Sequence, residues 1–233
     1  MKPLWSDLAP SWSDWREVAH LVPADPRVVP QYAVQIPGGW ALTQGRDNST
    51  GSNTTDDLIL SRFGPDGGRA VETRTVLRGG HGDRAYVVDG HLVTQIRGIW
   101  AKVTFGSPWS WKGTATPPRC SLRAGDGCQG EASLGGGRWA RLYGESIKGG
   151  SERDPSHRTA FLQLIDGTKV VRKVDLDHVA RDSKGLPIGG RYEPEGVSVG
   201  VVDGVRCALV GFSVGRLGST TMRVYALPLD HLT

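Results

Sequence analysis

The chain has 233 residues, of which 22% are charged and 38% aliphatic or aromatic, and it contains 33 glycines and 14 prolines. This balance is typical of a globular protein with a substantial core, and no apolar run is long enough to span a membrane. The net charge of +4 comes from basic residues scattered singly among acids, which favours a solvated surface over nucleic-acid binding. The beginning of the chain, MKPLWSDLAP, has no apolar segment, so we expect no secretion signal.

The first thirty residues differ in composition from the rest. Three tryptophans crowd together there, and three prolines follow at positions 23, 26 and 30. Asp14 and Glu17 resemble a capping box and predict a short helix that ends near His20, because the prolines prevent its extension. We therefore expect residues 1–30 to form a Trp/Pro-rich arm with one small helix. The arm either closes against its own domain or attaches the protein to another chain.

From Gln31 onward the apolar residues alternate with polar ones and glycine turns separate the alternating runs. Six such hairpins are visible, in segments 32–45, 57–77, 84–105, 131–144, 159–176 and 195–214. The pattern recurs with starts near Gln31, Arg84, Glu131 and Glu195, and its first intervals approach the roughly 40–50 residues of a propeller blade. We expect residues 31–233 to form an all-β, antiparallel β-propeller, five-bladed by length, with a β-sandwich as the competing architecture.

Three loops carry residues suited to ligand binding. The polar loop at 43–57 contains Arg46, and the glycine-rich turn at 78–86 contains His81, Asp83 and Arg84. Arginines pair with phosphate oxygens, whereas His81 and Asp83 either contact a ligand or satisfy each other. A third loop holds Trp109 and Trp111, two apart, whose faces either stack on sugar rings or pack in the core.

Motifs for catalysis and for metal binding are absent from the sequence. It has no G-x-S-x-G elbow, no H-E-x-x-H and no P-loop, and its three cysteines include no C-x-x-C pair, so we expect neither a metal nor a cofactor. Cys120 and Cys128 bracket a turn and either form a disulfide or remain reduced thiols. A glycosidase would need two facing carboxyls, for which the candidates are Asp56, Asp83, Glu193 and Glu195.

Several short motifs resemble one family. They are Gly80-His81-Gly82, Ile99-Trp100, Glu193-Pro194-Glu195-Gly196, and Gly211-Phe212-Ser213 with Gly215 and Gly218. Between Gln31 and Leu229 the chain is similar to the receptor-binding and teichoic-acid-biosynthesis-protein-C-like β-propellers of phage tails and Gram-positive surface proteins. In this resemblance Glu193 and Glu195 stand where a blade begins, at the rim or mouth of a central channel, with a structural or ligand-orienting role.

The resemblance implies a non-catalytic, receptor-binding protein at the tail tip or baseplate of a virion, made in the host cytoplasm. Its partners would be a host cell-wall polysaccharide or teichoic-acid-like polymer and other tail or baseplate proteins. The sequence does not decide whether the protein forms a homo-oligomer. Two alternatives are a glycan-cleaving propeller glycosidase and a structural tail subunit that binds only other tail proteins. The expected ligand-binding residues are Arg46, His81, Asp83, Arg84, Trp109, Trp111, Glu193 and Glu195.

Overall fold

The computed structural model describes residues 15–46, 56–82, 84–106, 109–113, 115–116, 119–125, 127–146, 158–181, 184, 188, 192–215 and 218–232. These residues contain no α-helix, and a 3-10 turn covers Leu229–His231. Within the same ranges, no helix is long and apolar enough to cross a membrane. The all-β class predicted from the hairpin pattern is confirmed.

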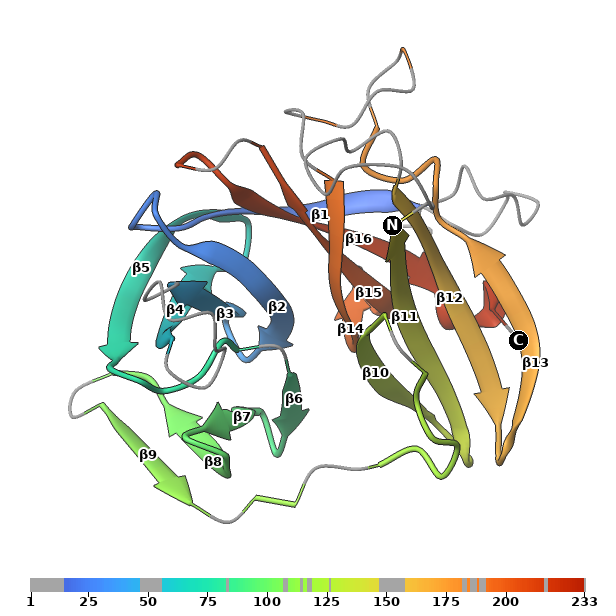
Figure 1. Cartoon of the computed structure of the whole chain (residues 1–233), viewed down its shortest axis with the longest axis horizontal. Coiled ribbons are helices and arrows are strands. Elements are labelled where there is room, and N and C mark those ends of the chain that lie inside the picture. The colour runs from blue at the N-terminus through green and yellow to red at the C-terminus, as the bar shows by residue number, and fades with distance from the viewer. Residues whose placement is uncertain are drawn as a thin grey trace.

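Sixteen strands follow one another along the described chain (Figure 1). They are β1 (Arg16–Val22), β2 (Val29–Ile36), β3 (Gly39–Arg46), β4 (Asp57–Gly64), β5 (Gly67–Val76), β6 (Ala85–Val88), β7 (His91–Ile96), β8 (Ile99–Thr104), β9 (Ser110–Gly113), β10 (Cys128–Gly135), β11 (Arg138–Ser146), β12 (Arg158–Asp166), β13 (Lys169–Asp175), β14 (Tyr192–Val202), β15 (Val205–Val214) and β16 (Thr221–Pro228).

Two-residue turns connect many neighbouring strands. Asp89 and Gly90 between β6 and β7, like Asp203 and Gly204 between β14 and β15, both have positive φ. Two successive positive φ angles define the type I′ turn, whose twist matches that of the flanking strands. The Asp-Gly turns predicted from the sequence are therefore confirmed, and each holds two strands in antiparallel register.

The strands form three sheets. One sheet has eight strands in the order β14-β15-β16-β1-β5-β4-β3-β2, and the others have four each, β6-β7-β8-β9 and β10-β11-β12-β13. The eight-stranded sheet consists of two antiparallel meanders joined where β1 runs parallel to β5 over three residue pairs. Its edge strands also meet, since Ser198 Oγ donates to the Ala33 carbonyl and the Gln35 amide donates to the Val201 carbonyl. The sheet therefore nearly closes into a barrel (Figure 1).

The prediction of a five-bladed propeller is wrong. The recurring hairpins begin at β2, β6, β10 and β14, and the described residues hold four such four-stranded meanders, two of which merge into one sheet. The fourth meander takes its last strand, β1, from the beginning of the chain. Dividing the chain length by a blade length missed this, because that estimate assigned the residues before Gln31 to no sheet, whereas β1 lies there.

The short helix predicted in the arm is also wrong, because Arg16–Val22 forms strand β1. Ala19 and Leu21 are buried, while Val18, His20 and Val22 are more exposed, which is the two-residue period of a strand. Pairing with β16 satisfies the backbone groups of both strands, which a short isolated helix would not do. Trp15 is buried beside this strand in a core cluster, and residues 1–14 lie outside the described part of the chain.

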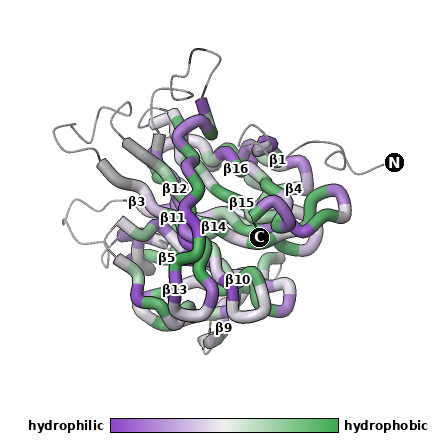
Figure 2. Tube along the Cα trace, turned by 90° about the vertical axis from the view of Figure 1, so that its right-hand side faces the viewer, coloured by the Kyte–Doolittle hydropathy of each residue, from purple (hydrophilic) through white to green (hydrophobic). Residues whose placement is uncertain are grey.

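Three hydrophobic clusters hold the meanders together, and each draws buried side chains from more than one of them. The first includes Leu142, Leu162, Val210 and Phe212, the second Leu21, Trp40, Phe63 and Leu209, and the third Val34, Leu60, Leu92 and Val103. Hydrophobic positions accordingly lie along the strands, whereas the turns are mostly hydrophilic (Figure 2). The first strands of the four meanders, β2, β6, β10 and β14, come nearest to the centre of the molecule (Figure 1).

Candidate functional site

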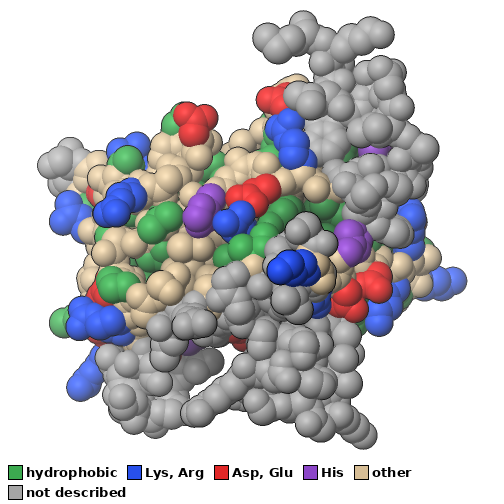
Figure 3. Space-filling view, turned by 90° about the horizontal axis from the view of Figure 1, so that it is seen from above, with side chains coloured by type: hydrophobic (Ala, Val, Ile, Leu, Met, Phe, Trp, Pro, Cys, Tyr) green, Lys and Arg blue, Asp and Glu red, His purple; other side chains and the backbone are tan. Residues whose placement is uncertain are grey.

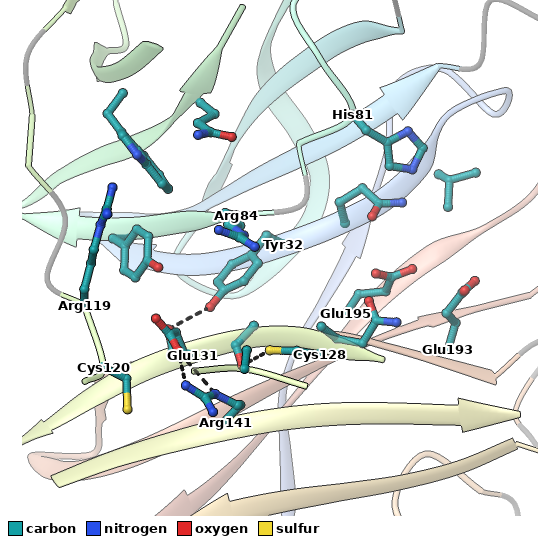
Figure 4. A pocket seen from close by; sticks show the side chains of 18 of the residues that line it. Tyr32, His81, Arg84, Arg119, Cys120, Cys128, Glu131, Arg141, Glu193 and Glu195 are labelled. Atoms are coloured by element: carbon teal, nitrogen blue, oxygen red, sulfur yellow. Dashed lines mark hydrogen bonds and ion pairs between the residues drawn. The ribbon is translucent and has the colours of Figure 1, made fainter. Parts of the chain in front are cut away.

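A cavity of about 1290 Å³ lies where these four first strands converge (Figure 4). Its walls also include residues from β7, β8 and β11 and from the segment before β10. The charged residues that line it are Arg27, Arg46, His81, Arg84, Arg119, Arg123, Glu131, Arg141, Glu193 and Glu195. Six arginines thus face three glutamates, and the cavity has a net positive charge although the basic residues are scattered in the sequence.

Tyr32 on β2 ties three strands together beside the cavity. Its hydroxyl donates to the main-chain carbonyl of Val197 on β14 and, at 3.4 Å, to that of Glu131 on β10 (Figure 4). A Cβ atom placed on Gly130 or Gly196 would lie 2.7 or 2.5 Å from ring carbons of Tyr32, so both glycines leave room for the ring. Because the side chain is buried, the pKa of Tyr32 is raised well above its usual value.

Glu193 and Glu195 both line the cavity, as their two-residue spacing on an extended strand predicts (Figure 4). Glu195 is buried, whereas Glu193 is half-buried. The pairing of β14 with β15 shifts register between Pro194 and Val197, and this bulge places Gly196, with φ +93°, against Tyr32. The Glu-Pro-Glu-Gly stretch therefore begins an inner strand and shapes the cavity wall.

Arg46 and Arg27 enclose a carboxylate at one side of the cavity. Asp25 accepts hydrogen bonds from the side chain and the main-chain N–H of Arg27, at 2.9–3.0 Å, and from Arg46. Arg46 also lies 3.8 Å from a carboxylate oxygen of Asp57. The hydrogen bonds from Arg27, with the Arg46 guanidinium, hold the pKa of Asp25 well below its usual range. Both arginines are therefore partly neutralised within the protein.

His81 pairs with a buried carboxylate other than the one expected. Its Nδ1 lies 2.5 Å from Oδ2 of Asp56, whose residue is 3% exposed. The ring rests on Gly45, where a Cβ atom would meet Nδ1 at 2.6 Å. Asp83, the partner considered from the sequence, lies outside the described residues. His81 thus borders the cavity in a position determined by Asp56 and Gly45.

Glu131 and Arg141 form a cross-strand ion pair between β10 and β11. Arg141 is 1% exposed, and its Nη2 lies 2.9 Å from Glu131 and 2.6 Å from the Leu122 carbonyl. A third bond, at 3.3 Å, reaches the Arg123 carbonyl. This ion pair, in which Arg141 is buried and Glu131 half-buried, anchors the segment 119–125 against the sheet. The sequence did not reveal it, because no local pattern marks either residue as half of a pair.

Three of the lining arginines have no such acidic partner. Within the ranges that the structure describes, no carboxylate lies at salt-bridge distance from Arg84, Arg119 or Arg123, and all three are exposed. On the face seen in Figure 3, by contrast, basic side chains are spread among acidic and uncharged ones. The cavity therefore offers guanidinium groups that an anion can engage bidentately.

The two tryptophans predicted to bind a ligand do not line the cavity. Trp109 is half-buried against the third hydrophobic cluster, and Trp111, which is 38% exposed, lies on the edge strand β9. The aromatic side chains at the cavity are instead Tyr32, Tyr86 and Trp100. The Ile99-Trp100 motif was the one sequence signal that could have indicated the last of them.

The described residues show neither a disulfide nor a metal site. Cys120, Cys128 and Cys207 are free thiols, and burial raises the pKa of Cys128. No group of three or more His, Cys, Asp or Glu side chains within the described ranges could hold a metal ion. Of the eight predicted ligand-binding residues, the cavity brings together Arg46, His81, Arg84, Glu193 and Glu195.

Comparisons with known proteins identify a structural relative. No protein-family model matches the chain, and no curated protein sequence matches it significantly. A solved structure titled "Tail fiber of Staphylococcus aureus phage P68" is similar, with a TM-score of 0.66 and 10% sequence identity. The match covers 92% of this chain and 52% of the tail fiber, so this chain spans about half of that protein's length. At this level of identity the likeness shows a shared fold.

Proposed function

We propose that this chain is a phage tail protein whose central cavity binds an anionic glycan polymer of the host cell wall without cleaving it. The fold shared with a phage tail fiber over 92% of the chain supports the tail assignment, and with it a location in the virion beside other tail or baseplate proteins. The observation that carries the binding role is the cavity with its three arginines that lack a carboxylate partner among the described residues.

The charge of the cavity favours an anionic ligand. A concave wall with an excess of one sign of charge raises the local concentration of oppositely charged ligands. Arginine forks match the oxygens of phosphate groups, and Arg84, Arg119 and Arg123 are exposed enough to reach them. A teichoic-acid-like polymer, which repeats phosphate groups along a chain of sugars or polyols, offers this chemistry.

The size of the cavity favours a polymer over a single small molecule. Pockets for small ligands typically have volumes of about 300–1,000 Å³, and this cavity, at about 1290 Å³, exceeds that range. Of its three glutamates, Glu131 is held in an ion pair with Arg141. A carboxylate neutralised in this way supports binding in preference to glycoside hydrolysis.

Sedimentation with isolated bacterial cell walls tests the proposal. We expect the protein to bind walls from a susceptible Gram-positive host and not the same walls after hydrofluoric acid has removed their phosphodiester-linked polymers. The double variant Arg84→Ala/Arg123→Ala should bind at least tenfold more weakly, a loss of about 1.4 kcal/mol. The matched control is Arg69→Ala/Arg206→Ala, which removes two exposed arginines that do not line the cavity.

Three results would contradict the proposal. The two double variants could bind walls equally, which would place the ligand elsewhere on the protein. Wild-type protein could fail to bind walls from every strain of a broad panel while still binding tail proteins, as a purely structural subunit would. Release of reducing sugar from the walls by the wild-type protein would indicate a glycosidase.

A further inference from the structure

Trp100 and Tyr86 form an aromatic pair on the wall of the cavity. Their ring centroids are 5.4 Å apart and the planes are tilted by 59°. Tyr86 is on β6 and Trp100 on β8, and both are half-buried, so part of each ring remains accessible. Burial raises the pKa of Tyr86 to about 12, and its hydroxyl therefore stays protonated and able to donate a hydrogen bond at neutral pH.

The sheet geometry places this pair on the face of β6–β9 that borders the cavity. Trp100 is directly opposite Gln95 in the β7–β8 pairing, and Tyr86 is directly opposite Val93 in the β6–β7 pairing. Residues two apart on a strand share a face, so Tyr86, Gln95 and Trp100 share one, and all three line the cavity. The other face carries Leu92, Ile96, Ala101 and Val103, which build the third hydrophobic cluster.

Trp100 stands apart from the hydrophobic clusters of the core. The neighbouring Trp109 packs against the third hydrophobic cluster, but Trp100 and Tyr86 belong to none of the three clusters found among the described residues. A large aromatic side chain that is accessible in this cavity, with a glutamine opposite it, has the composition of a sugar subsite. There the ring faces of a sugar stack on the indole and its hydroxyls bond to the amide.

Two arginines line the cavity within electrostatic range of Tyr86. The positive charges of Arg84 and Arg119 both act on Tyr86, and both side chains line the same cavity (Figure 4). Neither has a carboxylate at salt-bridge distance within the described part of the chain. An anionic group attached to a sugar stacked on Trp100 would therefore meet guanidinium groups.

We infer that Trp100, Tyr86 and Gln95 form a subsite for one hexose unit of the ligand and that Arg84 and Arg119 bind a phosphate attached to that hexose. The inference rests on the proposed function and deepens it, because it names the repeating unit that the cavity selects: a glycosyl phosphate. An unglycosylated polyol phosphate would engage the arginines alone and would bind more weakly.

The test uses small soluble probes: glucose 1-phosphate and N-acetylglucosamine 1-phosphate, with the neutral sugars and inorganic phosphate beside them. In a ¹H–¹⁵N spectrum, the indole signal that disappears in Trp100→Phe identifies Trp100. We expect at least one sugar phosphate to shift this signal at a concentration at least tenfold lower than either the neutral sugar or phosphate alone. Trp100→Ala should weaken that binding at least tenfold, whereas Trp111→Ala, away from the cavity, should leave it unchanged.

Arg119→Ala separates the two halves of the subsite. It should remove the advantage of the sugar phosphate over the neutral sugar and leave binding of the neutral sugar unchanged. An unshifted Trp100 signal with every sugar phosphate would overturn the inference, and this readout uses wild-type protein, so it holds even if a variant fails to fold. If wild-type protein sediments with walls but shows no such shift, the subsite is wrong and the proposed function stands. If a sugar phosphate shifts the Trp100 signal but the protein does not bind walls, the subsite stands and the proposed function is wrong.

Discussion

Gly196 is the residue on which the geometry of the inner strands depends most directly. Its φ of +93° is a conformation that side-chain-bearing residues rarely adopt, and a Cβ atom there would lie 2.5 Å from Tyr32 Cδ2. The Tyr32 ring in turn carries the hydroxyl that bonds to Val197 on the same bulged strand. The glycine in Glu-Pro-Glu-Gly thus allows β2 and β14 to meet around an aromatic ring.

Replacing this glycine should be costly for two separable reasons. We expect Gly196→Ala to lower the free energy of unfolding by about 2–4 kcal/mol, of which about 1–2 comes from backbone strain and the rest from displacing Tyr32. Gly204→Ala is the matched control, because Gly204 has φ +81° but no atom within 4 Å of an added Cβ, so it should lose about 1–2 kcal/mol. Urea unfolding measures both; equal losses would mean that Tyr32 yields without cost.

At the residue scale, sequence reasoning found cavity residues where local chemistry marked them. Arg46 stands at the end of β3, His81 and Arg84 lie in the glycine-rich segment before β6, and all three line the cavity. The pairing of His81 with Asp56 was not predictable, because it joins residues 25 apart through the approach of His81 to Gly45. Trp111 is exposed to solvent and Trp100 is exposed to the cavity. The alternation of residues along a strand does not distinguish these two kinds of exposure.

Among the elements, β1 contributes more to the fold than its length indicates. It pairs antiparallel with β16 and parallel with β5, so it covers an edge of both meanders in the eight-stranded sheet. Leu21 pairs with Met222 of β16 and with Gly68 of β5, and it is fully buried in the second hydrophobic cluster. Packing of this one side chain therefore supports two interfaces.

Truncating that side chain tests the role of the strand. Leu21→Ala should lower the free energy of unfolding by about 2–5 kcal/mol, the usual cost of emptying a buried leucine site. The matched control is Leu77→Ala, since Leu77 is 64% exposed and its loss should change stability by less than about 0.5 kcal/mol. Thermal or urea unfolding provides the measurement. A small loss in Leu21→Ala would indicate that β1 is dispensable.

The helix was predicted for this segment from local sequence alone, without knowledge of the distant strand with which the segment pairs. Asp14 and Glu17 provide a local helix-start signal, and nothing nearby opposes it before Pro23. The competing structure depends on β16, whose partner residues lie about 200 positions further along the chain. Hairpins were predicted correctly because both of their strands and the turn fall within about twenty residues.

For the whole molecule, the sharing of cores between meanders makes independent folding of any one of them unfavourable. Each hydrophobic cluster takes side chains from at least two meanders, and β1 links the first meander to the last. The number of meanders was not predictable from the hairpin spacing, because the connections differ in length and one strand lies out of sequence order. The cavity likewise exists only after all four inner strands have met.

We therefore expect the protein to unfold in one cooperative transition. Urea unfolding curves followed by tryptophan fluorescence and by far-ultraviolet circular dichroism should coincide. Leu162→Ala in the first cluster and Leu21→Ala in the second should each shift both curves together, although the two residues lie in different sheets. Separate transitions in either variant would show that one sheet survives the loss of another.

The pairing of β1 with β16 also has a consequence for biosynthesis. The ribosome releases Arg16 long before Ala226, and at about 5–20 residues per second the intervening 210 positions take roughly 10–40 s to translate. Throughout that interval, Ala19 and Leu21 have no partner strand on the side that β16 will cover. A nascent chain of this protein can complete its eight-stranded sheet only after β16 has been translated, so β1, the first strand of the described residues, is among the last to gain its partner.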